Sequence, residues 1–262
     1  MRTIKKVASH IFIDGFGGMT QGLFATLIIG TMIQQIGLLI GGSTGNVIYL
    51  LGKAAAALTS AGIGVGVAVK YGESPLVTVS AAVAAMVGGY AGKITGGTFF
   101  VDGNAVLAGP GEPLGAFIAA FAGITCGHLV SGKTKVDIIV TPVITIGAGS
   151  VVGLLVGPPI SQMMTGLGSI INWATEQRPF IMGIVVSVVM GMVLTLPISS
   201  AALGIILNLS GLAAGAATIG CCCNMVGFAV ASYRENKFGG LVAQGLGTSM
   251  LQVPNIMRHP LI

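Results

Sequence analysis

Charged side chains are scarce in this sequence of 262 residues. Lysine, arginine, aspartate and glutamate together make up 7% of it, whereas hydrophobic residues make up 53% and the mean hydropathy is +0.95. Soluble domains usually carry about 25% charged residues. A soluble fold of this size could not bury so much apolar surface, so the solvent must be lipid. We therefore expect an all-α integral membrane protein, a polytopic helical bundle of about seven to nine spans with broken helices and re-entrant hairpins.

The sequence also has little from which to build a disulfide framework, a metal centre or a hydrolytic site. Three of its four cysteines are adjacent, at 221–223, and Cys126 lies in another apolar run, so no Cys-x-x-Cys spacing occurs. Neither a metal-ligand cluster nor a Ser-His-Asp arrangement can be assembled from the three histidines and seven acidic residues. We expect no metal, no cofactor and no catalytic residue, and hence a protein that is not an enzyme.

Two features that suggest nucleotide or nucleic-acid binding have simpler explanations. Residues 127–134 match the phosphate-binding pattern GxxxxGK[ST], but they lie at the exit of an apolar segment, without the strand and α/β domain that this chemistry needs. The net charge of +5 arises mostly from basic residues at the ends of apolar runs, where they act as orientation signals. We expect no ATP binding and no nucleic-acid partner.

Glycine, in contrast, is abundant. The chain has 43 glycines, about twice the usual fraction. Small residues four apart let membrane helices approach closely. Such spacings join Gly37 to Gly41, Gly88 to Gly92, Gly149 to Gly153 and Gly211 to Gly215. Those in the first spans would offer packing faces for a homodimer formed through the N-terminal half.

The hydropathy pattern divides the chain into three parts. Residues 1–21 predict an amphipathic N-terminal segment, and residues 22–132 predict an N-terminal transmembrane region that serves as scaffold and dimerisation surface. Residues 133–262 predict a core with two hairpins. In the second predicted span, residues 47–69, Lys53 lies near the start, where its side chain could reach the membrane surface.

The core follows a regular order of apolar runs and breaks. A run from Ile138 to Val156 is expected to stop at the Gly-Pro-Pro of residues 157–159, and an amphipathic piece follows at 160–173. A second span, 180–196, ends at Pro197. The last segment, 239–256, is too polar for an ordinary span and predicts a re-entrant hairpin. Such breaks are tolerated at membrane depth only where protein or a wet cavity satisfies the freed backbone groups.

Basic residues predict the orientation. If Arg2, Lys5 and Lys6 are cytoplasmic, the loops at 70–75, 131–137 and 233–238 fall on the same side and carry most of the remaining basic residues. We expect a multi-pass protein of a bacterial inner membrane with a cytoplasmic N-terminus.

Neutral polar side chains gather on the broken segments and predict a binding site for a polar small molecule. In the last segment these are Thr248, Ser249, Gln252 and Asn255, and the expected facing partners are Ser199, Ser200 and Asn224. Hydroxyl and amide groups can hold a sugar hydroxyl or a polar head group through directed hydrogen bonds. The alternative is that they join helices to one another.

Glu112, in GPGEP, is a less favoured candidate for the same site. It is the only acidic residue inside an apolar run, and an intramembrane carboxylate is a functional candidate because its burial is costly. The alternative is that the flanking prolines place it at an interfacial break in contact with water.

Several stretches resemble a known family. They are VDIIVTPVITI (136–146), VGLLVGPPISQMMTGLGSIINW (152–173), FIMGIVVSVVMGM (180–192), LPISSAALG (196–204) and IGCCCNMVGFAVASYRENKF (219–238). Together they are similar to the membrane-embedded IIC subunit of bacterial sugar phosphotransferase systems (PTS), in particular the fructose-like branch and the perfringolysin-regulator (PfoR) type subgroup. The resemblance is good over residues 110–262 and general before them.

The resemblance implies a IIC-like permease for a sugar or related polar small molecule. It also implies separate IIA and IIB phosphotransferase partners, a homodimer, and a core that here lacks the family's final helix. The family's second hairpin carries a glutamate that binds the sugar, and Gln252 is its nearest counterpart here. That replacement motivates the alternative, a membrane-embedded sensor or regulator that kept the fold without phosphotransfer-coupled transport.

Overall fold

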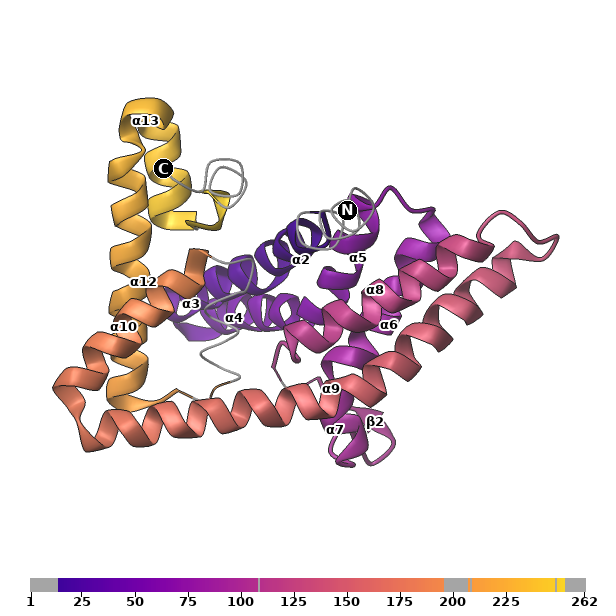
Figure 1. Ribbon diagram of the computed structural model, residues 1–262, viewed down its shortest axis with the longest axis horizontal. Helices are drawn as coiled ribbons and strands as arrows, with labels where there is room; N and C mark the ends of the chain where they lie inside the picture. Colours follow the sequence, from indigo (N-terminus) through magenta and orange to yellow (C-terminus); the bar gives the residue numbers. More distant parts are fainter. Residues whose placement is uncertain (1–13, 108, 196–206, 208, 248, 253–262) are drawn as a thin grey trace, which may run out of the picture. The chain divides into compact units, whose positions relative to one another are not determined.

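The computed structural model describes residues 14–107, 109–195, 207, 209–247 and 249–252 (Figure 1). Nearly all of these residues are helical. By packing, the chain forms two units, Met1–Gln162 and Met163–Ile262, and each is described by itself. The division falls inside one helix, and the predicted functional boundary between residues 132 and 133 stays a prediction.

The N-terminal unit consists of helices and one small β-hairpin. In chain order it holds α2 (Phe16–Leu23), the π-helix η2 (Phe24–Ile28), α3 (Ile29–Ile40), α4 (Gly42–Ala57), α5 (Thr59–Lys70), α6 (Pro75–Gly89), α7 (Ala91–Thr95), β1 (Phe100–Val101), β2 (Asn104–Ala105), α8 (Pro113–Val130) and the first part of α9 (Asp137–Gln177). The strands pair antiparallel within the polar loop that follows α7. Both α6 and α8 begin at a proline, which lacks the N–H that the first helical position would leave unpaired.

Glycines set the distance between the helices of this unit. Gly22 of α2 faces the backbone of Gly62 in α5, and Gly30 of α3 faces Gly52 in α4 so closely that an added methyl group would touch backbone atoms. The turn between α3 and α4 is made at Gly41, whose φ of +66° favours glycine. The close approach expected from the glycine content is therefore present.

The glycines singled out by spacing fall into two groups. Gly37, Gly88, Gly149 and Gly153 lie at close contacts with other helices, as predicted. Gly41 and Gly211 instead have positive φ, and Gly215 has no neighbour within 4 Å of where a Cβ would stand. Spacing alone did not distinguish a packing glycine from a turn glycine.

The second predicted span is broken. Helices α4 and α5 meet at Leu58 with a bend of 53°. The Tyr90 hydroxyl donates to the carbonyl of Ala57 at 3.2 Å and also to that of Gly109. The Ser60 hydroxyl donates to the carbonyl of Pro110 at 3.0 Å. The loop before α8 is thereby held against the break, where it satisfies polar groups that lipid could not.

The structure corrects one expectation for the core. The Gly-Pro-Pro at 157–159 does not end a helix, because α9 continues through Pro158 and Pro159 to Gln177. A proline removes one backbone hydrogen bond, and membrane helices tolerate this loss where neighbouring helices cover the site. Gly157 supplies such a contact, since its backbone lies against Ala91 and Gly88 of neighbouring segments.

The described helices fit a helical membrane protein. Within the described residues, four helices are long and apolar enough to cross a membrane, and the bent pair α4–α5 makes up to five. The spans are Phe16–Ile40, Pro113–Val130, Asp137–Met163 and Gly211–Ala231, and α6 and α10 (Pro179–Thr195) are shorter apolar helices. The predicted count of seven to nine spans stays a prediction.

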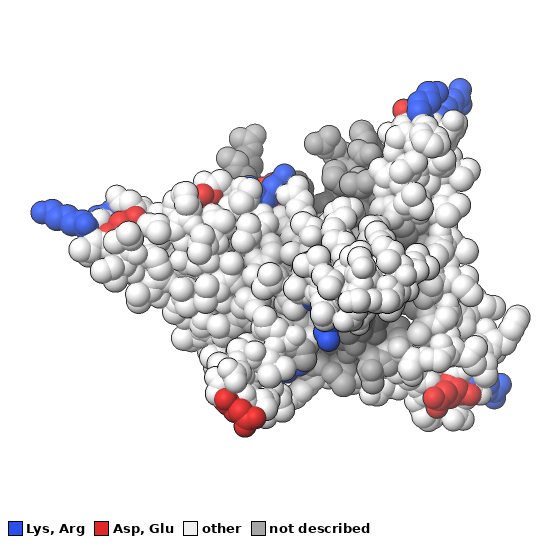
Figure 2. Space-filling model, turned by 180° about the vertical axis from the view of Figure 1, so that it is seen from behind, with Lys and Arg blue, Asp and Glu red and all other residues white. Residues whose placement is uncertain are grey.

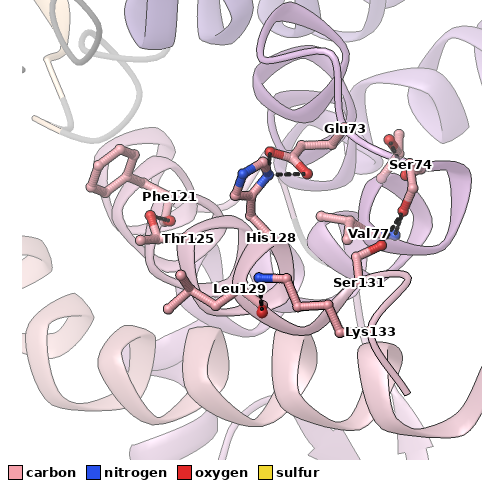
Figure 3. Close-up of polar contacts among 10 residues, drawn as sticks. Glu73, Ser74, Val77, Phe121, Thr125, His128, Leu129, Ser131 and Lys133 are labelled. Atoms are coloured by element: carbon pink, nitrogen blue, oxygen red, sulfur yellow. Dashed lines mark hydrogen bonds and ion pairs between the residues drawn. The ribbon is translucent and has the colours of Figure 1, made fainter. Parts of the chain in front are cut away.

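Polar contacts join two loops at one end of the N-terminal unit (Figure 3). The His128 ring lies 3.0 Å from a carboxylate oxygen of Glu73, and the hydroxyls of Ser74 and Ser131 share a hydrogen bond of 3.0 Å. Gly15, which precedes α2, lies beside the Tyr71 hydroxyl. The start of α2 and the loops 70–75 and 131–137 are thus neighbours. The predicted cytoplasmic side of these loops stays a prediction. Figure 2 shows charged side chains in small groups on an otherwise uncharged surface.

The orientation of this end can be tested by cysteine labelling in a background without native cysteines. We expect Lys135→Cys to react with a membrane-impermeant maleimide only after permeabilisation, because its loop is predicted to be cytoplasmic. Ser43→Cys, at the start of α4 beyond the first span, should react in intact cells. Labelling of position 135 from outside would reverse the predicted orientation.

The importance of helix contacts can be tested on one helix of the C-terminal unit, α12 (Gly211–Ala231). A methyl group on Gly220 would collide with the carbonyl of Ser187, whereas one on Gly215 meets nothing within 4 Å. Gly220→Ala should therefore lower the melting temperature, at a cost of about 1–3 kcal/mol from overpacking. Gly215→Ala should leave it unchanged or raise it slightly, since alanine favours helix. Equal effects of the two substitutions would contradict this packing.

Candidate functional site

The C-terminal unit is built on the close packing of α10 and α12. Gly220 of α12 faces the backbone of Ser187, and the Cβ position of Gly191 lies 2.9 Å from the carbonyl oxygen of Gly220. One turn away, Val186, Met190 and Ala217 form a small buried cluster. These contacts hold the two helices backbone to backbone, so a polar side chain near them cannot turn away into lipid.

The chain then reverses and returns along α12. Helix α13 (Tyr233–Val242) contains a kink at Lys237, whose φ is +52°, so the polar loop predicted at 233–238 is largely helical. The π-helix η3 (Ala243–Gly247) packs against α12 and α13, and the 3₁₀ turn η4 (Ser249–Gln252) packs against α10 and α12 (Figure 1). As far as Gln252, the last segment therefore has the returning, broken course expected of a re-entrant hairpin.

A pair of hydrogen bonds fixes the beginning of this return. Gln244 of η3 is 3% exposed, and its amide nitrogen lies 3.1 Å from the Ser232 hydroxyl at the end of α12. The same hydroxyl lies 3.3 Å from the amide oxygen of Gln244. Both polar groups are satisfied within the protein, so this contact has a structural role: it fixes η3 against the end of α12.

Asn224 is held in place but is not satisfied. Its amide nitrogen donates to the Thr195 hydroxyl at 3.4 Å, which fixes the side chain between α12 and the end of α10. Its amide oxygen is buried and has no hydrogen-bond partner among the described residues. An acceptor is therefore available at this position.

Ser249 is the second unsatisfied group in this unit. It is fully buried in η4, and its hydroxyl oxygen has no hydrogen-bond partner among the described residues. Leaving a buried polar group unpaired costs about 1–3 kcal/mol. Since η4 packs against the two helices that position Asn224, a hydroxyl donor and acceptor and an amide acceptor occur on neighbouring elements. Such neutral groups suit a polyhydroxylated ligand, whose own hydroxyls both donate and accept.

The predicted site residues are thus only partly brought together. Asn224, Ser249 and the partly buried Gln252 lie on α12 and η4. Four of the others, Ser199, Ser200, Thr248 and Asn255, lie outside the described residues. Glu112 belongs to the N-terminal unit. The roles of all these residues in substrate binding stay predictions.

Glu112 has a structural partner set of its own. Its carboxylate caps α8 by accepting from the backbone N–H of Leu114 at 3.0 Å and from that of Gly115. Burial raises the pKa of the Glu112 carboxyl, and these two N–H donors oppose the rise. The residue is 8% exposed, so it does not sit at a water-exposed break. Capping a buried helix start accounts for an acidic residue here without a ligand.

Sequence reasoning missed Thr195 and Gln244. Thr195 directly precedes the predicted break at Leu196-Pro197, and a hydroxyl at a helix end near a break was a usable signal. Gln244 lies in the last segment, which the sequence marked only as too polar for an ordinary span. Within the described residues, no group of three His, Cys, Asp or Glu could hold a metal ion.

The comparison with protein families returned one match that covers almost the whole chain. The sequence profile of the family described as "Phosphotransferase system, EIIC" matches residues 13–262. No curated protein and no solved structure matches the chain.

The unpaired hydroxyl of Ser249 allows a test that distinguishes a ligand-binding residue from a structural one. Ser249→Ala removes an unpaired buried hydroxyl, so the ligand-free protein should keep or gain thermal stability. Gln244→Ala breaks a satisfied buried pair in the same segment and should lower the melting temperature, by the equivalent of about 1–3 kcal/mol. Thermal denaturation of both variants in detergent checks this. A Ser249→Ala variant as unstable as Gln244→Ala would show that the hydroxyl has a structural partner.

Proposed function

Because the chain belongs to the phosphotransferase system EIIC family, we propose that it is a permease for a sugar or a related polar small molecule. The EIIC domain is the transmembrane transport component of these systems and cooperates with IIA and IIB proteins. In this proposal those partners are separate chains, and IIB supplies the phosphoryl group. The chain itself performs no chemistry on the substrate.

One observation carries the location of the substrate site. Asn224 and Ser249 each keep a buried polar atom without a partner in the described part of the chain, on elements that pack against one another. A sugar hydroxyl would satisfy both, and Gln252 would add a second amide at the end of η4. Ser199, Ser200, Thr248 and Asn255 are further members of the proposed site.

The resemblance to the fructose-like branch and the PfoR type subgroup is part of the proposal. So are a homodimer formed through the N-terminal half and a bacterial inner membrane with the N-terminus in the cytoplasm. The glycine contacts that bring α2, α3, α4 and α5 together support a rigid N-terminal scaffold on which a second copy could pack.

A second function, a membrane-embedded sensor or regulator, is favoured by a specific feature of the sequence. No acidic residue occurs after Glu235, so the last segment has no carboxylate to hold a sugar in the way the family resemblance implies. A protein that binds a solute weakly through neutral groups can report its presence without moving it. Transport assays distinguish the two functions.

The amide of Gln252 provides the test. Losing one partner of a buried neutral hydrogen bond costs about 1–3 kcal/mol, so Gln252→Ala should weaken sugar binding about tenfold to a hundredfold. Gln252→Glu restores a carboxylate and should be tolerated, with equal or stronger binding. Thermal shift across a panel of sugars and sugar alcohols measures both effects.

Two controls complete the test. Membrane insertion of the two variants should match that of the unchanged protein. Uptake with purified IIA and IIB proteins in proteoliposomes would support the permease, whereas sugar binding without uptake would support the sensor. A destabilised Gln252→Glu variant that responds to no sugar would end the proposal that this segment is the substrate site.

A further inference from the structure

A lysine lies on an exposed, largely apolar face of the N-terminal unit. The first span, Phe16–Ile40, ends at the Gly41 turn, and α4 begins at Gly42. Lys53 is the twelfth residue of α4, so it lies roughly 17 Å from that turn along the helix, at 1.5 Å per residue. The hydrocarbon core is about 30 Å thick, so a turn at the membrane surface would place Lys53 close to its middle. A span that begins at residue 47, as the hydropathy pattern predicts, would instead leave Lys53 nearer a membrane surface.

The packing of the α3–α4 hairpin shows which side Lys53 occupies. Gly52 of α4 faces Gly30 and Gln34 of α3. Each following residue is turned by about 100° on its helix, since a helix has 3.6 residues per turn. In an antiparallel pair these two turns lead to the same side. Lys53 therefore shares one side of the hairpin with the residues that follow Gly30 and Gln34.

Those residues are Thr31 and Gln35, and all three side chains are exposed. The Thr31 hydroxyl already donates to the carbonyl of Leu27 at 2.7 Å, which leaves its oxygen free to accept. Neither Gln35 nor Lys53 makes a hydrogen bond or an ion pair with any other described residue. The exposed neighbours Met32, Leu38, Leu50 and Leu51 are apolar, so this polar group stands within an apolar face.

The chain offers Lys53 no carboxylate of its own. Glu73 pairs with His128, Glu112 caps α8, and Asp137 accepts from the Thr141 hydroxyl and the backbone N–H of Gly132. The other four acidic residues lie before a helix, in a turn, near a helix end or in the polar α13: Asp14, Asp102, Glu176 and Glu235. Every acidic residue of the sequence is included in this account. None lies on the hairpin, and none lies in the middle of a span.

We propose that Lys53, with the amide of Gln35, binds the anionic group of the solute that this protein carries, so that the cargo bears a carboxylate or a phosphate. A lysine at membrane depth faces a partner or water, because an unpaired charge in hydrocarbon is costly. The ammonium and the Gln35 amide can both donate to one anionic group. This inference rests on the permease function proposed above and narrows its cargo from polar solutes in general to anionic ones, such as sugar acids or sugar phosphates.

The test uses the full chain in nanodiscs of neutral phosphatidylcholine, with binding measured by thermal shift and isothermal titration. The probes are sodium gluconate, glucose 6-phosphate and sorbitol, with sodium chloride at matched ionic strength. We expect at least one of the two anionic probes to bind. Lys53→Gln should weaken that binding at least about tenfold, and Lys53→Arg, which keeps the charge, should retain most of it. The matched control Lys135→Gln, in an exposed loop, should have no effect.

Each outcome decides the inference. Preference for gluconate would identify a carboxylate cargo, and preference for glucose 6-phosphate a phosphate. Binding of an anionic probe that is equal in the unchanged protein and in Lys53→Gln would overturn the role of Lys53, as would binding of sorbitol alone. If Lys53→Gln instead changed only the dimer content, measured by mass in the same nanodiscs, the polar group would be a contact between copies and the inference would be wrong.

The same experiment separates this inference from the proposed function. Binding of sorbitol that depends on Gln252 and not on Lys53 would keep the substrate site in the C-terminal unit and remove the anionic cargo. Binding of gluconate that depends on Lys53 and is unchanged in Gln252→Ala would keep the anion site and remove Gln252 from the substrate site. Absence of binding by every probe would count against both.

Discussion

Backbone polar groups in hydrocarbon must find their partners inside the protein, and the organisation of this chain follows from that constraint. Regular helix satisfies most of them. Where the helix is interrupted between α4 and α5, the hydroxyl of Tyr90 reaches the carbonyl of Ala57, and Ser60 ties down the loop that precedes α8. The interruption is possible only because that loop returns to it from a distant part of the sequence. The broken span therefore depends on the loop that covers it.

Because the helices pack closely, polar side chains must also find their hydrogen-bond partners inside the protein. Without a hydrophobic driving force between helices in lipid, glycine contacts such as those of Gly22 with Gly62 and Gly191 with Gly220 let helices meet at their backbones. In such tight surroundings a polar side chain must be paired, as Gln244 is with Ser232. Among the described residues, the oxygens of Asn224 and Ser249 are two exceptions to this rule, and exceptions of this kind are where a ligand is expected.

The two candidate polar sites differ in charge. The site on α12 and η4 contains neutral amides and hydroxyls, whereas the site on the α3–α4 hairpin contains a lysine. A neutral site binds a polyol through many weak, directed bonds, and a cation selects for charge. If the cargo is anionic, the absence of a carboxylate near Gln252 is no longer a defect, because a carboxylate there would repel it. Gln252 in place of the family's glutamate, which suggested a protein that no longer transports, would then indicate a different cargo.

The sequence by itself determined the class of protein, since a chain with 7% charged residues and a mean hydropathy of +0.95 has no soluble fold available. It also determined the broken course of the last segment, because polar residues interrupt its apolar pattern. These features depend on composition and on residues close together in the sequence, so they can be predicted from the sequence alone.

Only the tertiary structure decided which polar residues are satisfied. Glu112, a candidate site residue in the sequence, caps a helix in the fold, and Gln244 is paired with Ser232. Asn224 and Ser249, in contrast, each keep an atom without a hydrogen-bond partner among the described residues. The passage of α9 through Pro158 and Pro159 was likewise mispredicted. The physical reason is common to these cases. Hydrogen bonding and helix continuity at a proline depend on groups brought together from distant parts of the chain, and no local pattern contains them.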